Sequence, residues 1–261
     1  MSVLYGLRAE AVSAALREGH RLDGRGLDVY RPIVVETNIS KNAEGSCRVR
    51  IGETEVLAGV KCLPGDPFPD TPNEGSISVS FEMLPIASPD FEPGPPSPFA
   101  IELARVVDRG IRESKAVDFA KLCIKSGGKV WIVFVDLYPI NDAGNLFDAC
   151  SIAALKALQE TRFPKLDSEM QIVKGEFGDK LKLERLPLEC TFVKIGDKIL
   201  VDPTAEEEKA MSARFTVGVT EDDYLTAFQK GGAGSFSESE IHSCIELAIK
   251  KTRELRKMVF K

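Results

Sequence analysis

Hydrophobic residues follow two different periods along this chain, and each period predicts a different kind of element. Four apolar residues between 77 and 83 alternate with polar neighbours, which predicts a half-buried strand over 76–86. Residues 129–138 include the apolar run VWIVFV, which predicts a strand at the centre of a sheet. Between 101 and 115 the period becomes helical. One side of that helix carries Leu103, Ala104, Val106, Val107, Gly110 and Ile111.

The same analysis predicts the remaining elements. Helices are expected over 4–18, 146–159 and 238–257, the last one beginning with a Ser237–Glu240 capping box. Further strands are expected over 33–40, 45–51, 54–62 and 121–124, with a hairpin over 188–204 and a strand pair over 213–232. Residues 205–211 are expected to form a short turn.

Strands and helices are mixed without strict alternation, which predicts an α+β fold with two related lobes of mixed sheet and helices. We expect an N-terminal helix and connector over 1–30, a first lobe over 31–185 that contains the helix 146–159, and a second lobe over 186–261.

Composition narrows the classes of function. The chain has 261 residues, of which 43% are hydrophobic and 28% charged, as in an ordinary globular protein. Its formal net charge is −6, so any site for a polyanion must be local. The six cysteines are scattered and only two histidines occur, which argues against a structural zinc site. No signal peptide or membrane-spanning run is visible, so we expect a cytoplasmic protein with reduced thiols, without a metal or cofactor.

Candidate chemistry is sparse. Neither histidine lies in a recognisable triad, no cysteine has a neighbouring histidine, and no nucleotide-binding fingerprint is present. Glu206, Glu207 and Glu208 follow Asp202, and such a cluster serves either as a magnesium or general-acid site or, more often, as a solvated charged turn. Asp148 is expected to cap the helix 146–159.

A row of three arginines stands out on the polar side of the helix 101–115. Arg105, Arg109 and Arg112 lie at i, i+4 and i+7. They form either a solvated outer face paired with interleaved acids, or a contact for phosphate or RNA. Arginine favours the second hypothesis, because its guanidinium forks onto phosphate oxygens.

Five segments, in this order, resemble the RNase PH family: RLDGRGLDVYRP, PFPDTPNEG, FEPGPP, IELARVVDRGIRESKAVD and DAGNLFDACSIAALKAL. Within that family they are most similar to the non-catalytic ring subunits of archaeal exosomes. The resemblance runs from about residue 19 to the last helix. It implies an RNase PH fold and a ring of three heterodimers with a catalytic paralogue, which degrades single-stranded RNA from the 3′ end by phosphorolysis, and which carries RNA-binding cap subunits.

The resemblance also assigns roles to positions. Catalytic members bind phosphate with a glycine, a small polar residue and an arginine, where this chain has Gly144, Asn145 and Leu146. They hold acids after the second-lobe hairpin, where Glu208 matches one acid and Arg214 replaces another. Both departures imply that this chain has no catalytic residues of its own.

The arginine row matches the family's pattern better. In the non-catalytic subunits two arginines one turn apart contact the RNA backbone, and they match Arg105 and Arg109, with Arg112 further along the same face. The resulting hypothesis is a non-catalytic, RNA-binding subunit that helps to structure its partner's active site. Two alternatives stay open: an autonomous phosphate-dependent 3′–5′ exoribonuclease, and a purely architectural ring subunit.

Overall fold

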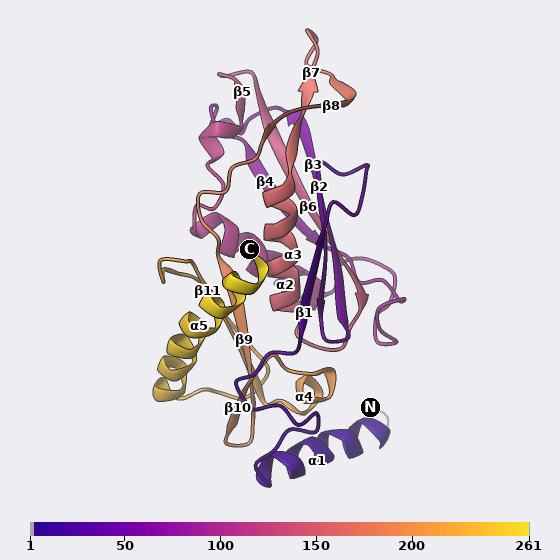
Figure 1. The fold of residues 1–261 in the computed structure, drawn as a ribbon, viewed down its shortest axis with the longest axis vertical. Coiled ribbons are helices and arrows are strands. Elements are labelled where there is room, and N and C mark those ends of the chain that lie inside the picture. The colour runs from indigo at the N-terminus through magenta and orange to yellow at the C-terminus, as the bar shows by residue number, and fades with distance from the viewer. Residues whose placement is uncertain (1–2, 261) are drawn as a thin grey trace.

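Two β-sheets and the helices packed between and beside them make up the computed structural model, which describes residues 3–260 (Figure 1). The first sheet has the order β1-β2-β3-β6-β4, with β5 paired to β6. Its strands are antiparallel except for the parallel pair β4–β6. The bounds are β1 (Ile33–Thr37), β2 (Gly45–Ile51), β3 (Thr54–Gly65), β4 (Ser76–Phe81), β5 (Cys123–Lys125) and β6 (Lys129–Asn141).

The second sheet is fully antiparallel, in the order β10-β9-β11-β12. Its strands are β9 (Leu188–Ile195), β10 (Lys198–Val201), β11 (Ala213–Val219) and β12 (Leu225–Gly231). A separate hairpin, β7 (Arg162–Leu166) and β8 (Ile172–Lys180), projects from one end of the molecule in Figure 1.

Two helices connect the sheets. α3 (Leu146–Glu160) packs on β2 and β3 of the first sheet and on β9 of the second, and α2 (Pro98–Glu113) packs on β4 and on β12. α3 is buried on every side from residue 146 to 158, as its small and apolar residues require. α5 (Glu238–Val259) packs on β9 and β11 of the second sheet. α1 (Val3–Arg17) packs against the short α4 (Ala205–Ala210).

Most expected elements are present. β6 lies between β3 and β4, which confirms the central strand predicted from its apolar run. The capping box of Ser237 and Glu240 is formed at the start of α5. One prediction was wrong: residues 205–210 form a helix with its own Thr204–Glu207 capping box instead of a turn. The strand expected over 121–124 is present as β5, but it begins later, at residue 123, because residues 119–122 form a 3₁₀ helix, η1 (Phe119–Leu122). β4 also ends at Phe81, because the proline-rich segment follows.

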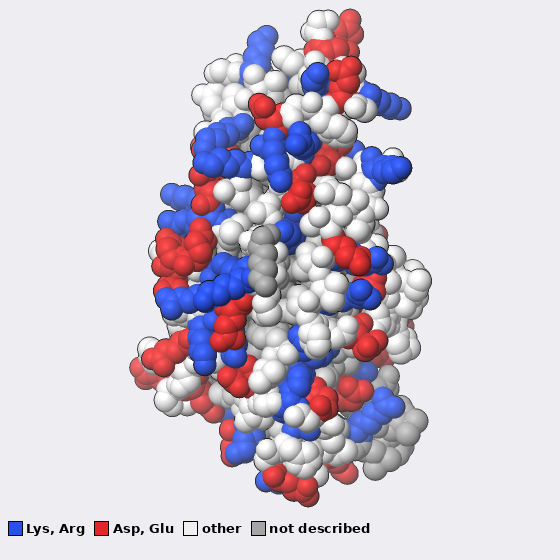
Figure 2. Space-filling model, in the orientation of Figure 1, with Lys and Arg blue, Asp and Glu red and all other residues white. Residues whose placement is uncertain are grey.

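The surface and the thiols agree with the composition. On the face shown in Figure 2, basic and acidic side chains are interspersed along the length of the molecule. All six cysteines are free, and five of them are buried. Within residues 3–260 no helix is long and apolar enough to cross a membrane.

Candidate functional site

The arginine row lies on α2, whose ends are set by local sequence. The Ser97 hydroxyl accepts a hydrogen bond from the Ala100 amide at 3.2 Å, and Pro98 occupies the first helical position, where a missing N–H costs nothing. The buried residues are Ala100, Leu103, Val106, Val107, Gly110 and Ile111. Packing of this face against two sheets holds the opposite, polar face in a defined place.

The structure separates the three arginines. Arg105 is exposed and has no hydrogen-bond or ion-pair partner among the described residues. Arg109 is half-buried and donates from Nη1 to the Phe228 carbonyl of β12 at 3.1 Å. Arg112 is engaged elsewhere: it forms an ion pair with Asp108 at 3.0 Å and donates to the Ile77 carbonyl of β4 at 3.0 Å.

Arg105 and Arg109 border a shared depression. This open hollow of about 480 Å³ is lined by Pro98, Ile101, Glu102, Arg105, Arg109 and Gln229. Arg112 does not line it. Its apolar surface comes from Pro98 and from Ile101, which is 49% exposed. The depression thus combines two guanidinium groups with apolar surface, which suits a phosphodiester backbone with its bases.

Two polar side chains that line this depression, Glu102 and Gln229, form a network with the buried Arg214. Glu102 Oε1 accepts from Arg214 Nη2 at 2.6 Å and from Gln229 Nε2 at 2.8 Å. The network ties α2 to β11 and β12. Sequence reasoning missed Gln229; the alternation of apolar and polar residues along 225–231 is the signal for a strand here, but it does not show which helix the strand faces.

Arg214 is buried, with 6% of its surface exposed. Its guanidinium carbon lies 4.1 Å from the centroid of the Phe147 ring, in the first turn of α3. Gly231 lies across the strand pair from Arg214, and a Cβ there would come within 2.6 Å of Nη2, so the glycine leaves the room that the guanidinium needs. A cation thus fills the place where the family resemblance expects an acid.

The segment matched to the phosphate-binding motif forms the start of α3. Gly144 has φ +91°, and Asn145, the N-cap residue, has φ +60° and makes no capping hydrogen bond to the helix. The Asn145 side chain instead donates to Asp148 at 2.9 Å and to Asp202 at 2.8 Å. Leu146 is buried, with 2% of its surface exposed.

Glu208 comes from α4 and contacts this segment. Its Oε1 accepts from the Asn145 backbone N–H at 2.9 Å. Burial raises the pKa of Glu208 to about 7, although hydrogen bonding to Asn145 lowers it. The structure therefore brings Gly144, Asn145, Leu146, Glu208 and Arg214 to one place, and it links them to α2 through Arg214 and Glu102.

The prediction that Asp148 caps α3 was wrong, since no side chain caps that helix. Asp148 is fully buried and accepts hydrogen bonds from Tyr30 Oη at 2.6 Å and from Thr191 Oγ1 at 2.7 Å. Burial raises its pKa to about 6. Its role is to connect the N-terminal connector, α3 and β9.

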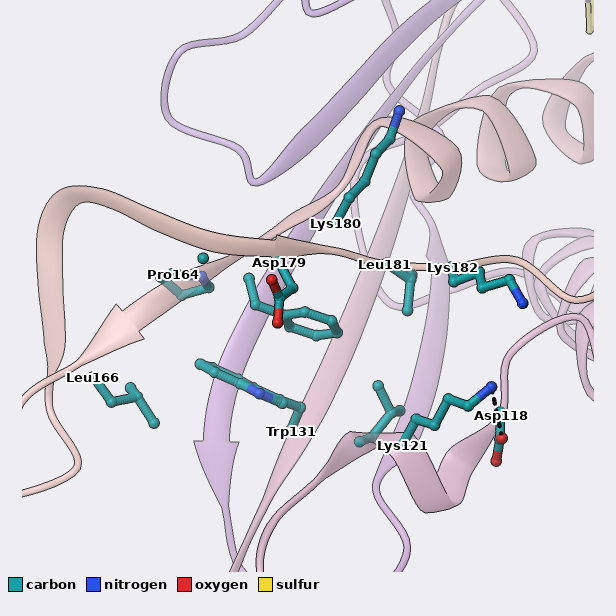
Figure 3. Close-up of a pocket in the computed structure, with 12 residues that line it drawn as sticks. Asp118, Lys121, Trp131, Pro164, Leu166, Asp179, Lys180, Leu181 and Lys182 are labelled. Atoms are coloured by element: carbon teal, nitrogen blue, oxygen red, sulfur yellow. Dashed lines mark ion pairs between the residues drawn. The ribbon is translucent and has the colours of Figure 1, made fainter.

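A second hollow, of about 490 Å³, lies beneath the β7–β8 hairpin (Figure 3). Its wall is the stacked pair Trp131 and Phe163, with ring centroids 5.3 Å apart. Lys121 at its rim is paired with Asp118 at 3.3 Å, as Figure 3 shows, and with Glu184 at 2.6 Å. The positive charge of Lys121 is therefore neutralised by these two carboxylates. None of the site residues predicted from the sequence lines this second hollow.

Metal and thiol chemistry find little support. Among the described residues no group of three or more histidine, cysteine, aspartate or glutamate side chains is placed to hold a metal ion. Burial raises the pKa of the Cys47, Cys62 and Cys244 thiols to about 12 in each case. These thiols are therefore poor nucleophiles.

Comparison with known proteins gives consistent results. The family model described as 3′ exoribonuclease family, domain 1 matches residues 29–164, and domain 2 of the same family matches residues 185–251. Exosome complex component Rrp42 of Thermococcus kodakarensis is 44% identical over 100% of this chain and 97% of its own length. Exosome complex component Rrp42 of Methanopyrus kandleri is also 44% identical, over 99% of this chain and 98% of its own. A chain in a solved structure described as the Archaeoglobus fulgidus exosome with RNA bound to the active site is 43% identical, with a TM-score of 0.94 and full coverage of both chains.

Proposed function

The chain belongs to the 3′ exoribonuclease (RNase PH) family, and we propose that it is a non-catalytic ring subunit of an archaeal exosome. In this role it alternates with a catalytic paralogue in a ring of three heterodimers, to which RNA-binding cap subunits attach. The full-length similarity to exosome components named Rrp42 supports this proposal. We place the complex in the cytoplasm, because the reducing conditions there keep cysteines such as these six in the free thiol form.

The observation that carries the RNA-holding part of this function is the arrangement of Arg105 and Arg109. They border one open depression, and Arg105 has no partner within the described part of the chain. We propose that both guanidinium groups hold phosphates of single-stranded RNA while the partner subunit performs the phosphorolysis. Arg112 is the weaker candidate, because binding RNA would compete with its ion pair to Asp108.

The local chemistry also favours a non-catalytic role. The residue at the position of the phosphate-binding arginine is the buried Leu146, which cannot pair with an anion. The position matched to one acid is Arg214, which is already neutralised by Glu102. The chain therefore supplies contacts and shape, and the paralogue supplies the reacting groups.

The double variant Arg105→Glu/Arg109→Glu tests the RNA contact in the reconstituted ring. Loss of two phosphate contacts is expected to lower the slope of log K against log salt concentration by about 1.4 and to slow RNA trimming. A matched control is Lys250→Glu/Lys257→Glu, which makes the same charge change on exposed positions of α5. If the α2 variant assembles into the ring yet binds and trims RNA as the control does, the subunit is purely architectural.

A further inference from the structure

A buried cation lies behind the depression that Arg105 and Arg109 border. Arg214 is 6% exposed, and its one ion-pair partner among the described residues is Glu102, with Nη2 2.6 Å from Oε1. Its Nε makes no hydrogen bond within the same part of the chain. A buried guanidinium is costly unless a carboxylate neutralises it, so Arg214 depends on this single contact.

The second sheet directs this guanidinium toward α2. Its carbon lies 4.1 Å from the centroid of the Phe147 ring, and Gly231, opposite Arg214 in the β11–β12 pair, leaves room for Nη2. Gln229 lies two residues before Gly231, on the same side of the sheet, and donates to the same Glu102 oxygen at 2.8 Å. The Glu102 carboxylate is thus held by two donors of the second sheet.

This contact keeps Glu102 away from Arg105. The two residues are three positions apart on α2, a spacing at which opposite charges on a helix can pair. A comparable pair does form further along the same helix, where Asp108 and Arg112 lie 3.0 Å apart. Glu102 is engaged with Arg214 instead, and Arg105 has no partner within the described residues.

The charge of the depression depends on the same contact. Its charged lining residues are Glu102, Arg105 and Arg109. Without a further cation, the carboxylate would offset one of the two guanidinium groups and would repel a nearby phosphate. Because Arg214 neutralises Glu102 from behind, the charges of both α2 arginines remain uncompensated.

We propose that Arg214 is a positioning residue for RNA binding: it neutralises Glu102 and holds it against the second sheet, so that Arg105 and Arg109 stay free for phosphates. This inference rests on the proposed function, because it requires that the depression receives RNA. It gives the cation a role of its own at a position where the family resemblance expects an acid.

RNA affinity of the reconstituted ring tests this role, with Arg214→Met in place of the wild-type subunit. The substitution keeps an unbranched side chain but leaves the charge of Glu102 without its partner. We expect single-stranded RNA to bind about fivefold more weakly, and the slope of log K against log salt concentration to lose about 0.7 of its magnitude, as for one phosphate contact. The double variant Arg214→Met/Glu102→Gln should return both values to those of wild type.

The matched control is Arg253→Met on α5. It also leaves an acid, Asp223, without its ion-pair partner, but neither residue lines the depression. RNA affinity and its salt dependence should therefore stay as in wild type. Size-exclusion chromatography verifies that each variant ring assembles. If Arg214→Met does not assemble, Arg214→Gln removes the same charge and keeps a hydrogen-bond donor, and the same loss and restoration are expected.

The restoration by Glu102→Gln separates positioning from a general loss of structure. A loss of RNA binding that Glu102→Gln does not restore overturns the inference. Wild-type affinity and salt dependence of Arg214→Met also overturn it, and the proposed function then stands if Arg105→Glu/Arg109→Glu still weakens RNA binding. Unchanged RNA binding by Arg105→Glu/Arg109→Glu would refute the RNA contact itself, and this inference with it.

Discussion

At the scale of single residues, Glu189 is the most unusual group outside the candidate site. It is 2% exposed on β9, and both carboxyl oxygens lack a hydrogen-bond partner among the described residues. Gly110 of α2 provides the space, since a Cβ there would lie 3.3 Å from Oε1. Burial raises the pKa of Glu189 well above its usual range, Asp148 raises it further, and Arg109 only partly opposes this. Glu189 is therefore protonated more readily than an ordinary glutamate.

Glu189→Gln should reveal this raised pKa through the pH dependence of stability. A carboxyl whose folded pKa is raised stabilises the fold below its unfolded pKa, near 4.5, and loses that contribution as pH rises toward the folded value. Glutamine does not titrate, so its advantage in free energy of unfolding should grow by about 1.4 kcal/mol per pH unit above pH 5. Urea unfolding between pH 5 and 8 measures it.

The control for this experiment is Glu113→Gln, at the exposed end of α2. Its difference from wild type should stay flat over the same pH range. A flat difference for Glu189→Gln as well would mean that Glu189 is ionised when folded, with a partner that satisfies its charge.

At the scale of elements, the junction of α3 and α4 depends on one glycine. Gly144 has φ +91°, and a Cβ on it would meet three backbone atoms of residues 203–205 at 2.5–2.6 Å. Backbone atoms cannot move aside as a flexible side chain does. Any larger residue at this position must therefore push the start of α4 away from the start of α3.

Gly144→Ala is expected to lower the free energy of unfolding by about 2–5 kcal/mol, because backbone strain and overpacking add. The control is Gly196→Ala in the β9–β10 hairpin, where φ is +61° but a Cβ meets nothing within 4 Å. That control carries only the conformational cost of about 1–2 kcal/mol. Thermal unfolding measures the loss in free energy of unfolding for both variants. Equal losses for Gly144→Ala and Gly196→Ala would show that the junction tolerates a side chain.

Local patterns predicted the elements that are stabilised locally. The helical period of residues 101–115 marks the buried face of α2, and it also places Arg105 and Arg109 together, because one turn separates them. α4 escaped prediction because its main support is Arg21, 186 positions from Glu207. The pairing of Arg214 with Glu102 spans 112 positions, so no short-range pattern contains it. The β7–β8 hairpin depends similarly on the contact of Phe163 with Trp131.

At the scale of the whole molecule, α2 and α3 each pack against both sheets. This packing connects the depression bordered by Arg105 and Arg109 with the start of α3. Arg214 of the second sheet contacts Glu102 of α2 and Phe147 of α3. The arginine-bordered depression on α2 and the start of α3 are therefore connected through one buried side chain. With a net charge of −6 the chain as a whole does not attract RNA, so the proposed RNA contact depends on the local pair Arg105 and Arg109.

This arrangement predicts that the chain alone does not degrade RNA. Incubated with single-stranded RNA and inorganic phosphate, the purified chain should release no nucleoside diphosphates, because the buried Leu146 cannot pair with phosphate and the cation of Arg214 stands where the family resemblance expects an acid. Addition of the catalytic paralogue should restore release, and the products are measured by chromatography. Nucleoside diphosphates formed by the unaccompanied wild-type chain would instead identify an autonomous phosphorolytic exoribonuclease.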